Sequence, residues 1–304
     1  MKELKDCFKL SKQEIVSVIG SGGKSSLIAY LANSYSYKKV LISTTTKILM
    51  PKDGEYDELW LNLMSWEREI KPGIVIAGDE VIQNGILKLQ MPRNPKFVKT
   101  FNQFDIVFLE SDGSRGLPLK GWEDDEPVIL PESSLTIGVV PITAIGKPIT
   151  DEFIHRLSLW LELIEDVDDK IMSIDNNMSI DNNMSIDRNV STDENVITYK
   201  DIDVDKERKN GRDKKKEGFL VSEKDVADTI ANEKGLWNKA KGERVLFINQ
   251  VEDKEQLEVA KRVVELIPND CKERLSRIIV GSVQKKVGEV VYLASEQSIV
   301  IGFR

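Results

Sequence analysis

The stretch Ile15-Val16-Ser17-Val18-Ile19-Gly20-Ser21-Gly22-Gly23-Lys24-Ser25-Ser26-Leu27-Ile28-Ala29 decides the fold. It joins a β-branched apolar run, typical of a buried strand, to a glycine-rich turn and then to a helix-like apolar pattern. Glycines let backbone N–H groups approach an anion, and the helix that follows aims the positive end of its dipole at the same point. Strand, turn and helix in this order therefore predict a phosphate-binding loop.

The loop resembles the pattern G-x-x-x-x-G-K-[ST], except that Val18 occupies the first glycine position. Lys24 is expected to reach the β- and γ-phosphates, and the Ser25 hydroxyl to bind Mg²⁺. The alternative is a glycine-rich turn that binds nothing. The residues predicted to surround the nucleotide here are Gly20, Ser21, Gly22, Gly23, Lys24, Ser25 and Ser26. Because Lys24 serves a ligand in this interpretation, we expect it to contribute little to the core.

Composition excludes several other classes of protein. The chain has 304 residues, is 40% hydrophobic and carries a net charge of -8, which argues against a surface for duplex nucleic acid. Apolar runs are too short to span a bilayer, and the N-terminal residues lack the apolar core of a signal peptide. Cys7 and Cys271 are far apart in sequence, so we expect neither a disulfide framework nor a zinc site, and a cytoplasmic location.

A second chemical stretch runs from Phe104 to Gly116. Its apolar run predicts a strand buried on both faces, and Glu110 and Asp112 follow at its carboxyl end, where parallel sheets bind ligands. With Ser25, these two carboxylates are the predicted Mg²⁺ ligands, and they are also candidates for positioning the attacking water. The alternative is an ordinary Asp-Gly turn at Asp112.

Several polar residues near these strand ends are further candidates. Thr45 and Thr46 follow the predicted strand 40–43, where hydroxyls suit sensing of the γ-phosphate, although threonines also favour strands. Arg115 is a candidate to neutralise charge during phosphoryl transfer, and so is Lys120; alternatively both are solvated loop residues.

Asn249 follows a late apolar run, in the stretch Asn249-Gln250-Val251-Glu252. That stretch is similar to Asn-Lys-x-Asp, the guanine-reading motif of GTP-binding proteins, but glutamine and glutamate replace the lysine and the aspartate. Asn249 is therefore a candidate for contact with the nucleotide. The alternative is a turn that leads into the next helix.

The remaining pattern predicts an α/β fold with a mostly parallel sheet and helices on both faces, as in P-loop NTPases. Strands are expected at 58–61, 73–78, 85–89, 135–141, 244–249, 278–282 and 287–293, with the link between 73–78 and 85–89 near Asp79-Glu80. Helices are expected from about 94 to 103, from Asp151 through His155, and after an N-cap at Ser222.

Residues 165–217 differ in composition from the rest. The hexapeptide Met172–Asn177 is repeated from Met178 and, with one change, from Met184, and the tract holds 15 acidic and 10 basic residues. So few large apolar side chains cannot offset the entropy cost of ordering. We therefore predict one nucleotide-binding domain made of 1–164 and 218–304, with a disordered insertion at 165–217.

These motifs together resemble the YqeC family, whose members are described as accessory proteins of selenium-dependent hydroxylases. The resemblance rests on Gly-Gly-Lys-Ser at 22–25, Thr-Thr-Thr-Lys at 44–47, the segment 110–120, Ile-Gly-Lys-Pro at 145–148, His155-Arg156 and Asn249. It implies a nucleotide-binding factor that helps to mature selenium-dependent molybdenum hydroxylases, by preparing or inserting their cofactor.

Three functions therefore stay open at this point. The first is an Mg²⁺-dependent NTPase switch that uses ATP or GTP and acts on a client molybdenum hydroxylase or a cofactor-synthesis protein. The second is a small-molecule kinase, with Asp112 as base and Arg115 on the phosphoryl group. The third is a scaffold that binds nucleotide without hydrolysis. None of them involves nucleic acid or a membrane.

Overall fold

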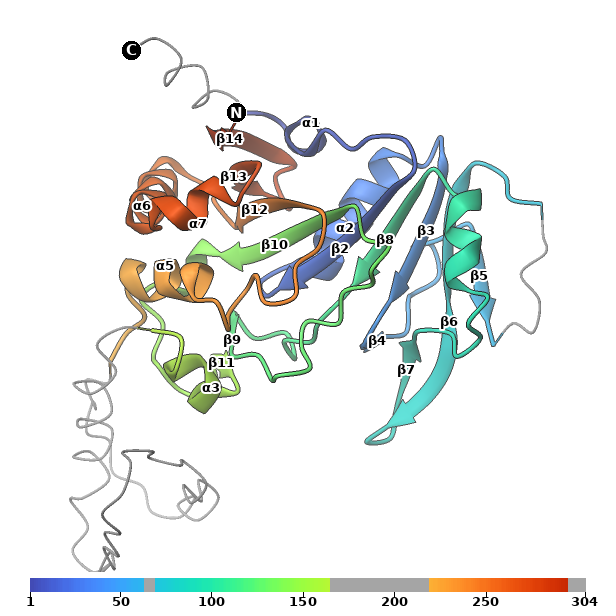
Figure 1. Ribbon diagram of the computed structural model, residues 1–304, viewed down its shortest axis with the longest axis horizontal. Helices are drawn as coiled ribbons and strands as arrows, with labels where there is room; N and C mark the ends of the chain where they lie inside the picture. Colours follow the sequence, from blue (N-terminus) through green and yellow to red (C-terminus); the bar gives the residue numbers. More distant parts are fainter. Residues whose placement is uncertain (63–68, 165–218, 295–304) are drawn as a thin grey trace, which may run out of the picture.

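The computed structural model describes residues 1–62, 69–164 and 219–294. Within these residues twelve strands form one sheet (Figure 1), in the order β1-β14-β13-β12-β10-β2-β8-β3-β6-β7-β4, with β5 beside β6. The central strands are parallel: β13 (Arg277–Ser282), β12 (Glu243–Asn249), β10 (Leu135–Pro141), β2 (Glu14–Gly20), β8 (Ile106–Glu110), β3 (Lys39–Thr44), β6 (Gly73–Gln83) and β5 (Glu58–Leu61). The predicted mostly parallel α/β sheet is confirmed.

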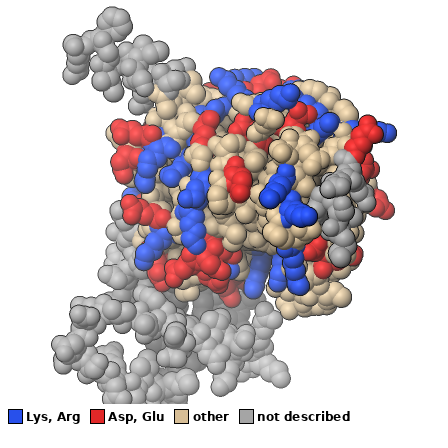
Figure 2. Space-filling model, turned by 45° about the vertical axis from the view of Figure 1, so that its right-hand side comes forward, with Lys and Arg blue, Asp and Glu red and all other residues tan. Residues whose placement is uncertain are grey.

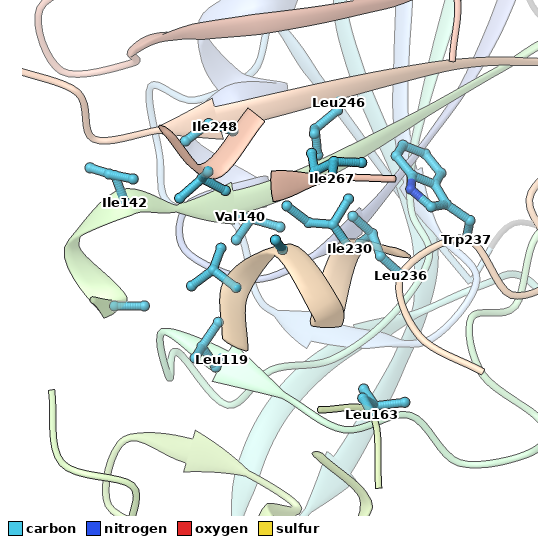
Figure 3. Packing of buried hydrophobic residues seen from close by; sticks show 14 of the residues in the cluster. Leu119, Val140, Ile142, Leu163, Ile230, Leu236, Trp237, Leu246, Ile248 and Ile267 are labelled. Carbon is cyan, nitrogen blue, oxygen red and sulfur yellow. The ribbon is translucent and has the colours of Figure 1, made fainter. Parts of the chain in front are cut away.

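Alternate side chains of the central strands enter cores on opposite faces of the sheet. Val18 of β2 packs in one cluster with Leu27 of α2 (Lys24–Ser34), whereas its neighbour Ile19 packs in another cluster with Ile230 of α5 (Glu223–Ala231). Figure 3 shows Ile230 and Leu236 beside Val140 in the second cluster. Such two-sided burial explains the continuous apolar runs in these strands.

Helices cover both faces, as predicted. The face with α2 also carries α1 (Leu4–Phe8). The opposite face carries α5, α6 (Lys254–Leu266) and α7 (Asn269–Glu273), and further along the sheet the 3₁₀ helix η1 (Val98–Gln103). The predicted N-cap at Ser222 is confirmed, because its side chain and that of Asp225 form a reciprocal capping box that satisfies two backbone N–H groups at the start of α5.

Antiparallel strands complete the sheet at its ends. β14 (Val287–Leu293) pairs with β13 and with β1 (Lys2–Glu3), while β7 (Ile86–Gln90) lies between β6 and β4 (Lys47–Leu49). The link predicted near Asp79-Glu80 is wrong: β6 continues through both residues to Gln83, and the turn is at Asn84-Gly85. Both turn residues have positive φ, which suits asparagine and glycine at a hairpin turn.

Two predicted helices are wrong in type. His155 lies in β11 (Ile154–His155), which pairs with β9 (Leu119–Lys120) in a separate two-stranded sheet, and α3 (Leu157–Leu161) begins only after it. Arg156 has a positive φ of 56°, so a helix cannot pass through it. The helix expected from about 94 is limited to the 3₁₀ helix η1.

The predicted disordered insertion at 165–217 lies outside the described residues. Among the described residues, no helix is long and apolar enough to cross a membrane. On the face shown in Figure 2, lysine and arginine side chains are interspersed with aspartate and glutamate. The absence of a nucleic-acid partner stays a prediction.

Candidate phosphate site

The predicted site residues come from three adjacent strands. β8 lies directly between β2 and β3 and is parallel to both, so Gly20, Glu110 and Thr44 end their strands at the same edge of the sheet. The loop after β2 leads into α2 at this edge. The acids predicted to face the loop therefore lie beside it.

Close packing explains the three glycines of the loop. Gly20, Gly22 and Gly23 have φ of 94°, 73° and 124°, which residues with a Cβ rarely adopt. A Cβ on Gly22 would lie 2.3 Å from the Pro141 ring, and one on Gly23 would lie 2.5 Å from the Asn249 amide. Gly23 is also the N-cap of α2 and provides no side-chain cap, so α2 begins with N–H groups available to an anion.

Lys24 is buried at the base of the loop, with 4% of its surface exposed. Its ammonium donates a hydrogen bond of 2.6 Å to the Gly20 carbonyl and forms ion pairs with Asp112 Oδ1 at 3.3 Å and Glu110 Oε1 at 3.8 Å. The expectation that Lys24 contributes little to the core is therefore wrong. These contacts must be exchanged if the ammonium is to reach a phosphate.

Ser25 and Glu110 meet at the open side of the loop. Ser25 is exposed in the first turn of α2, and its hydroxyl donates a hydrogen bond of 2.6 Å to Glu110 Oε2. Burial raises the pKa of Glu110, although Lys24 and Ser25 partly oppose this shift. A hydroxyl and a carboxylate at this separation are oxygen donors of the kind that Mg²⁺ binds.

Asp112 has no exposed surface, and both of its oxygens are engaged. They accept hydrogen bonds from the Gly20 N–H (3.1 and 2.9 Å), and Oδ2 also accepts from Trp122 Nε1 at 2.8 Å. Lys24 and Lys120 lie 3.3 Å away on opposite oxygens. Burial alone would raise the pKa of Asp112, but the two ammonium groups and these hydrogen bonds outweigh it and lower the pKa.

Lys120 continues the ion pairs away from the loop. Its side chain has no exposed surface and forms a second ion pair with Glu126 at 2.8 Å, and Glu126 is paired at 2.6 Å with Arg156. The interpretation of Lys120 as a solvated loop residue is wrong. Trp122, Glu126 and Arg156 were missed as members of this network, because no sequence motif places Glu126 next to Arg156, which follows 30 residues later.

The threonines after β3 support the neighbouring chain. The Thr45 hydroxyl donates to the Val128 carbonyl at 2.6 Å, and Thr46 lies 3.3 Å from Thr44 through their hydroxyls. Thr44 itself donates to the Glu110 carbonyl at 2.8 Å. A sensing role for Thr45 and Thr46 stays a prediction, and any such role would require Thr45 to exchange this bond.

Arg115 lies exposed in the loop between Asp112 and β9, with a positive φ of 50°. That loop contacts the phosphate loop where the Ser21 hydroxyl donates to the Pro118 carbonyl at 2.6 Å. Arg115 therefore lies on a segment attached to the loop, and its role towards a phosphoryl group stays a prediction.

Asn249 braces the loop through both ends of its amide. Its Nδ2 donates to the Gly22 carbonyl at 2.9 Å, and its Oδ1 accepts from the Val283 N–H at 3.1 Å. This contact could not be predicted from the sequence, since Asn249 and Gly22 are 227 positions apart in the chain. The predicted contact with a base stays a prediction.

The residues present fit a magnesium-bound nucleotide. The fit rests on the Ser25–Glu110 pair at the loop and on the glycines that a Cβ would block. Among the described residues, no three His, Cys, Asp or Glu side chains cluster as a metal site. The Ser25 hydroxyl and the Glu110 carboxylate would supply oxygen ligands to a cation whose other ligands come from phosphate and water, as is usual for Mg²⁺. Of the predicted ligands, Ser25 and Glu110 are better placed than the fully engaged Asp112.

Comparison with known proteins finds a family whose model covers this site. A family model described as YqeC protein matches residues 16–158, which include the phosphate loop and the segment from Glu110 to Lys120. The chain is 28% identical over 158 residues to "Uncharacterized protein YqeC" of Escherichia coli (strain K12). That alignment covers 49% of this chain and 60% of the relative, so the chain spans less than two thirds of the relative's length. No solved structure matches.

Proposed function

Since residues 16–158 of this chain match the model of the YqeC family, we propose that the site is a nucleotide site and that the chain is a nucleotide-binding accessory protein. The observation that carries the proposal is the contact of Ser25 with Glu110, with the Lys24 ammonium 3.8 Å from the same carboxylate. Hydroxyl, ammonium and carboxylate thus converge where a glycine loop begins a helix. That combination suits a triphosphate with its Mg²⁺.

In this proposal the residues have separate tasks, and Glu110 has two. The N–H groups at the start of α2 and the Lys24 ammonium bind phosphate oxygens, and Ser25 and Glu110 hold Mg²⁺. When bound, Mg²⁺ neutralises charge on the phosphate oxygens. Asp112 positions the loop through the Gly20 N–H. Glu110 also orients a water in this proposal, because Asp112 is enclosed by its partners.

Of the possible reactions, we propose hydrolysis of ATP or GTP as a switch that a client protein reads. The described structure gives the kinase alternative less support, since Asp112 is buried under the loop and cannot accept a proton from an acceptor without exchanging its partners. The client, a selenium-dependent molybdenum hydroxylase or a protein that makes its cofactor, is proposed from the family resemblance alone.

Binding is tested by melting the protein with Mg-ATP and with Mg-GTP. A ligand at 100 times its Kd stabilises by about 2.7 kcal/mol, which raises Tm by roughly 5–10 °C. Lys24→Met should abolish the shift, and Lys12→Met, which changes an exposed lysine before β2, should keep it. Equal shifts in both variants, or no shift in the wild type, would refute the nucleotide site.

Turnover then separates the three functions. Phosphate release that a client accelerates supports the switch. Consumption of nucleotide only with a small acceptor supports the kinase, and binding without turnover under either condition leaves the scaffold.

A further inference from the structure

Asp112 has two cationic partners, and only one of them can serve a phosphate. Lys24 lies in the loop, whereas Lys120 lies in β9 and contacts the other oxygen of the carboxylate. With no exposed surface on Asp112, water cannot stabilise its charge. If Lys24 turned to a bound phosphate, Asp112 would still be paired with Lys120.

The contacts of the Lys120 ammonium keep it from moving towards a bound phosphate. Its ammonium donates to the Gly113 carbonyl at 2.7 Å, pairs with Glu126 at 2.8 Å and lies 5.2 Å from the centre of the Trp122 ring. Glu126 is held in turn by two hydrogen bonds from Arg156. Lys120 is thus held away from the ligand position by its own partners, whereas Lys24 lies in the loop that would bind the ligand.

From this geometry we propose that Lys120 is a positioning residue of the phosphate site, which holds Asp112 in place when Lys24 moves from Asp112 to a phosphate. The inference rests on the proposed nucleotide site. Through Asp112, Lys120 keeps the Gly20 N–H bonded and so fixes the start of the loop. Without Lys120, Lys24 is the sole counter-charge of Asp112 among the described residues. It is therefore retained at this buried carboxylate, and the affinity for phosphate falls.

The test is a double-mutant cycle read by nucleotide affinity. Lys120→Gln keeps a donor for the Gly113 carbonyl but removes the charge. It should weaken Mg-nucleotide binding at least about 100-fold, because Asp112 would be left without a cation when Lys24 moves to the phosphate. In the Asp112→Asn background, the same change should lower the affinity for Mg-nucleotide less than about threefold, because no charge remains at residue 112 to hold Lys24. Lys120→Arg, which keeps the charge, should recover most of the affinity lost in Lys120→Gln.

Controls separate this effect from a general loss of structure. Arg156→Met removes a partner of Glu126 but does not touch Asp112, so it should change affinity less than about threefold. If Lys120→Gln fails to fold, the comparison of Asp112→Asn with Asp112→Asn/Lys120→Gln and of Lys120→Arg with wild type decides the question. In that case, recovery of folding in Asp112→Asn/Lys120→Gln, with the nucleotide affinity of Asp112→Asn, shows that Lys120 acts through the Asp112 charge and supports the proposal. A large loss of affinity in that double variant relative to Asp112→Asn, or in Lys120→Arg relative to wild type, overturns it.

The inference and the proposed function fail in different ways. If wild type binds nucleotide through Lys24 but Lys120→Gln binds equally well, or loses the same factor with and without Asp112, the positioning role is overturned and the nucleotide site stands. If wild type binds neither nucleotide, the site itself is refuted, and the role of Lys120 falls with it.

Discussion

The Ser25 hydroxyl is hydrogen-bonded at 2.6 Å to Glu110, and this contact joins the first turn of α2 to the end of β8 across 85 residues of chain. It brings the two chemical stretches of the sequence into one site. The contact is possible because β8 is the immediate parallel neighbour of β2, so both carboxyl ends reach the same edge.

The first prediction follows from this contact and concerns Mg²⁺. Ser25→Ala removes a proposed metal ligand, so nucleotide affinity should fall about tenfold with Mg²⁺ present and change little without it. Isothermal titration with and without EDTA measures both values. Ser34→Ala, at the other end of α2, is the control and should match wild type. An equal loss in the presence and absence of Mg²⁺ would contradict a metal role for Ser25.

Lys24 gives a prediction about the unliganded protein. Lys24→Met should lower the free energy of unfolding by about 1–2 kcal/mol, less than the 3–5 kcal/mol for a fully orphaned buried charge, since Asp112 keeps Lys120. Urea denaturation should show a lower midpoint at an unchanged m-value. The exposed Lys12 again supplies the control. A midpoint equal to that of wild type would mean that the ion pairs of Lys24 contribute nothing to stability.

Because of His155, the free energy of unfolding should fall in mild acid. Burial, with Arg156 and Arg115 nearby, lowers the pKa of His155 from its ordinary 6.5 to about 4. Between these two pH values the unfolded chain binds a proton that the folded chain does not, so the free energy of unfolding falls as pH falls from 6.5 towards 4. At 1.36 kcal/mol for each pH unit, the loss is at most about 3 kcal/mol.

His155 is the single histidine of the sequence, so its titration can be followed without overlap from other imidazoles. NMR of its imidazole protons reports the pKa directly, and denaturation of His155→Gln over the same range should lack this part of the pH dependence. A midpoint near 6.5 in the folded protein would rule out the effect.

The sequence predicted the parallel sheet well because two-sided burial leaves a direct pattern, as in Phe104 to Leu109. It also predicted which residues would meet at the strand ends, since that follows from parallel pairing. The sequence did not predict contacts that depend on pairing between segments far apart in the chain. The burial of Lys120 depends on the pairing of β9 with β11, and both strands have only two residues. Such short strands carry no periodicity.

His155 and Lys24 show two further limits. The pattern after Asp151 is compatible with a helix, but the left-handed backbone at Arg156 ends any such helix, and arginine gives no sign of it in sequence. A lysine in a phosphate loop is expected to be exposed to solvent when no ligand is bound. Here two carboxylates and a carbonyl hold Lys24, an arrangement that requires the position of Asp112 in three dimensions.

The last prediction separates two roles for Asn249. Its amide joins the Gly22 carbonyl to the Val283 N–H, so Asn249→Ala should destabilise the protein by about 1–3 kcal/mol and leave the loop less well held. If Asn249 only braces the loop, affinity for Mg-ATP and Mg-GTP should fall by the same factor, because both nucleotides present the same phosphates. If Asn249 reads a guanine, GTP affinity should fall more than tenfold further than ATP affinity. Asn33→Ala, which removes a side chain near the end of α2, is the stability control. We expect affinity for both nucleotides to fall equally, since both ends of the amide are already hydrogen-bonded to the backbone. A selective loss of GTP affinity would show that Asn249 does more than hold the loop.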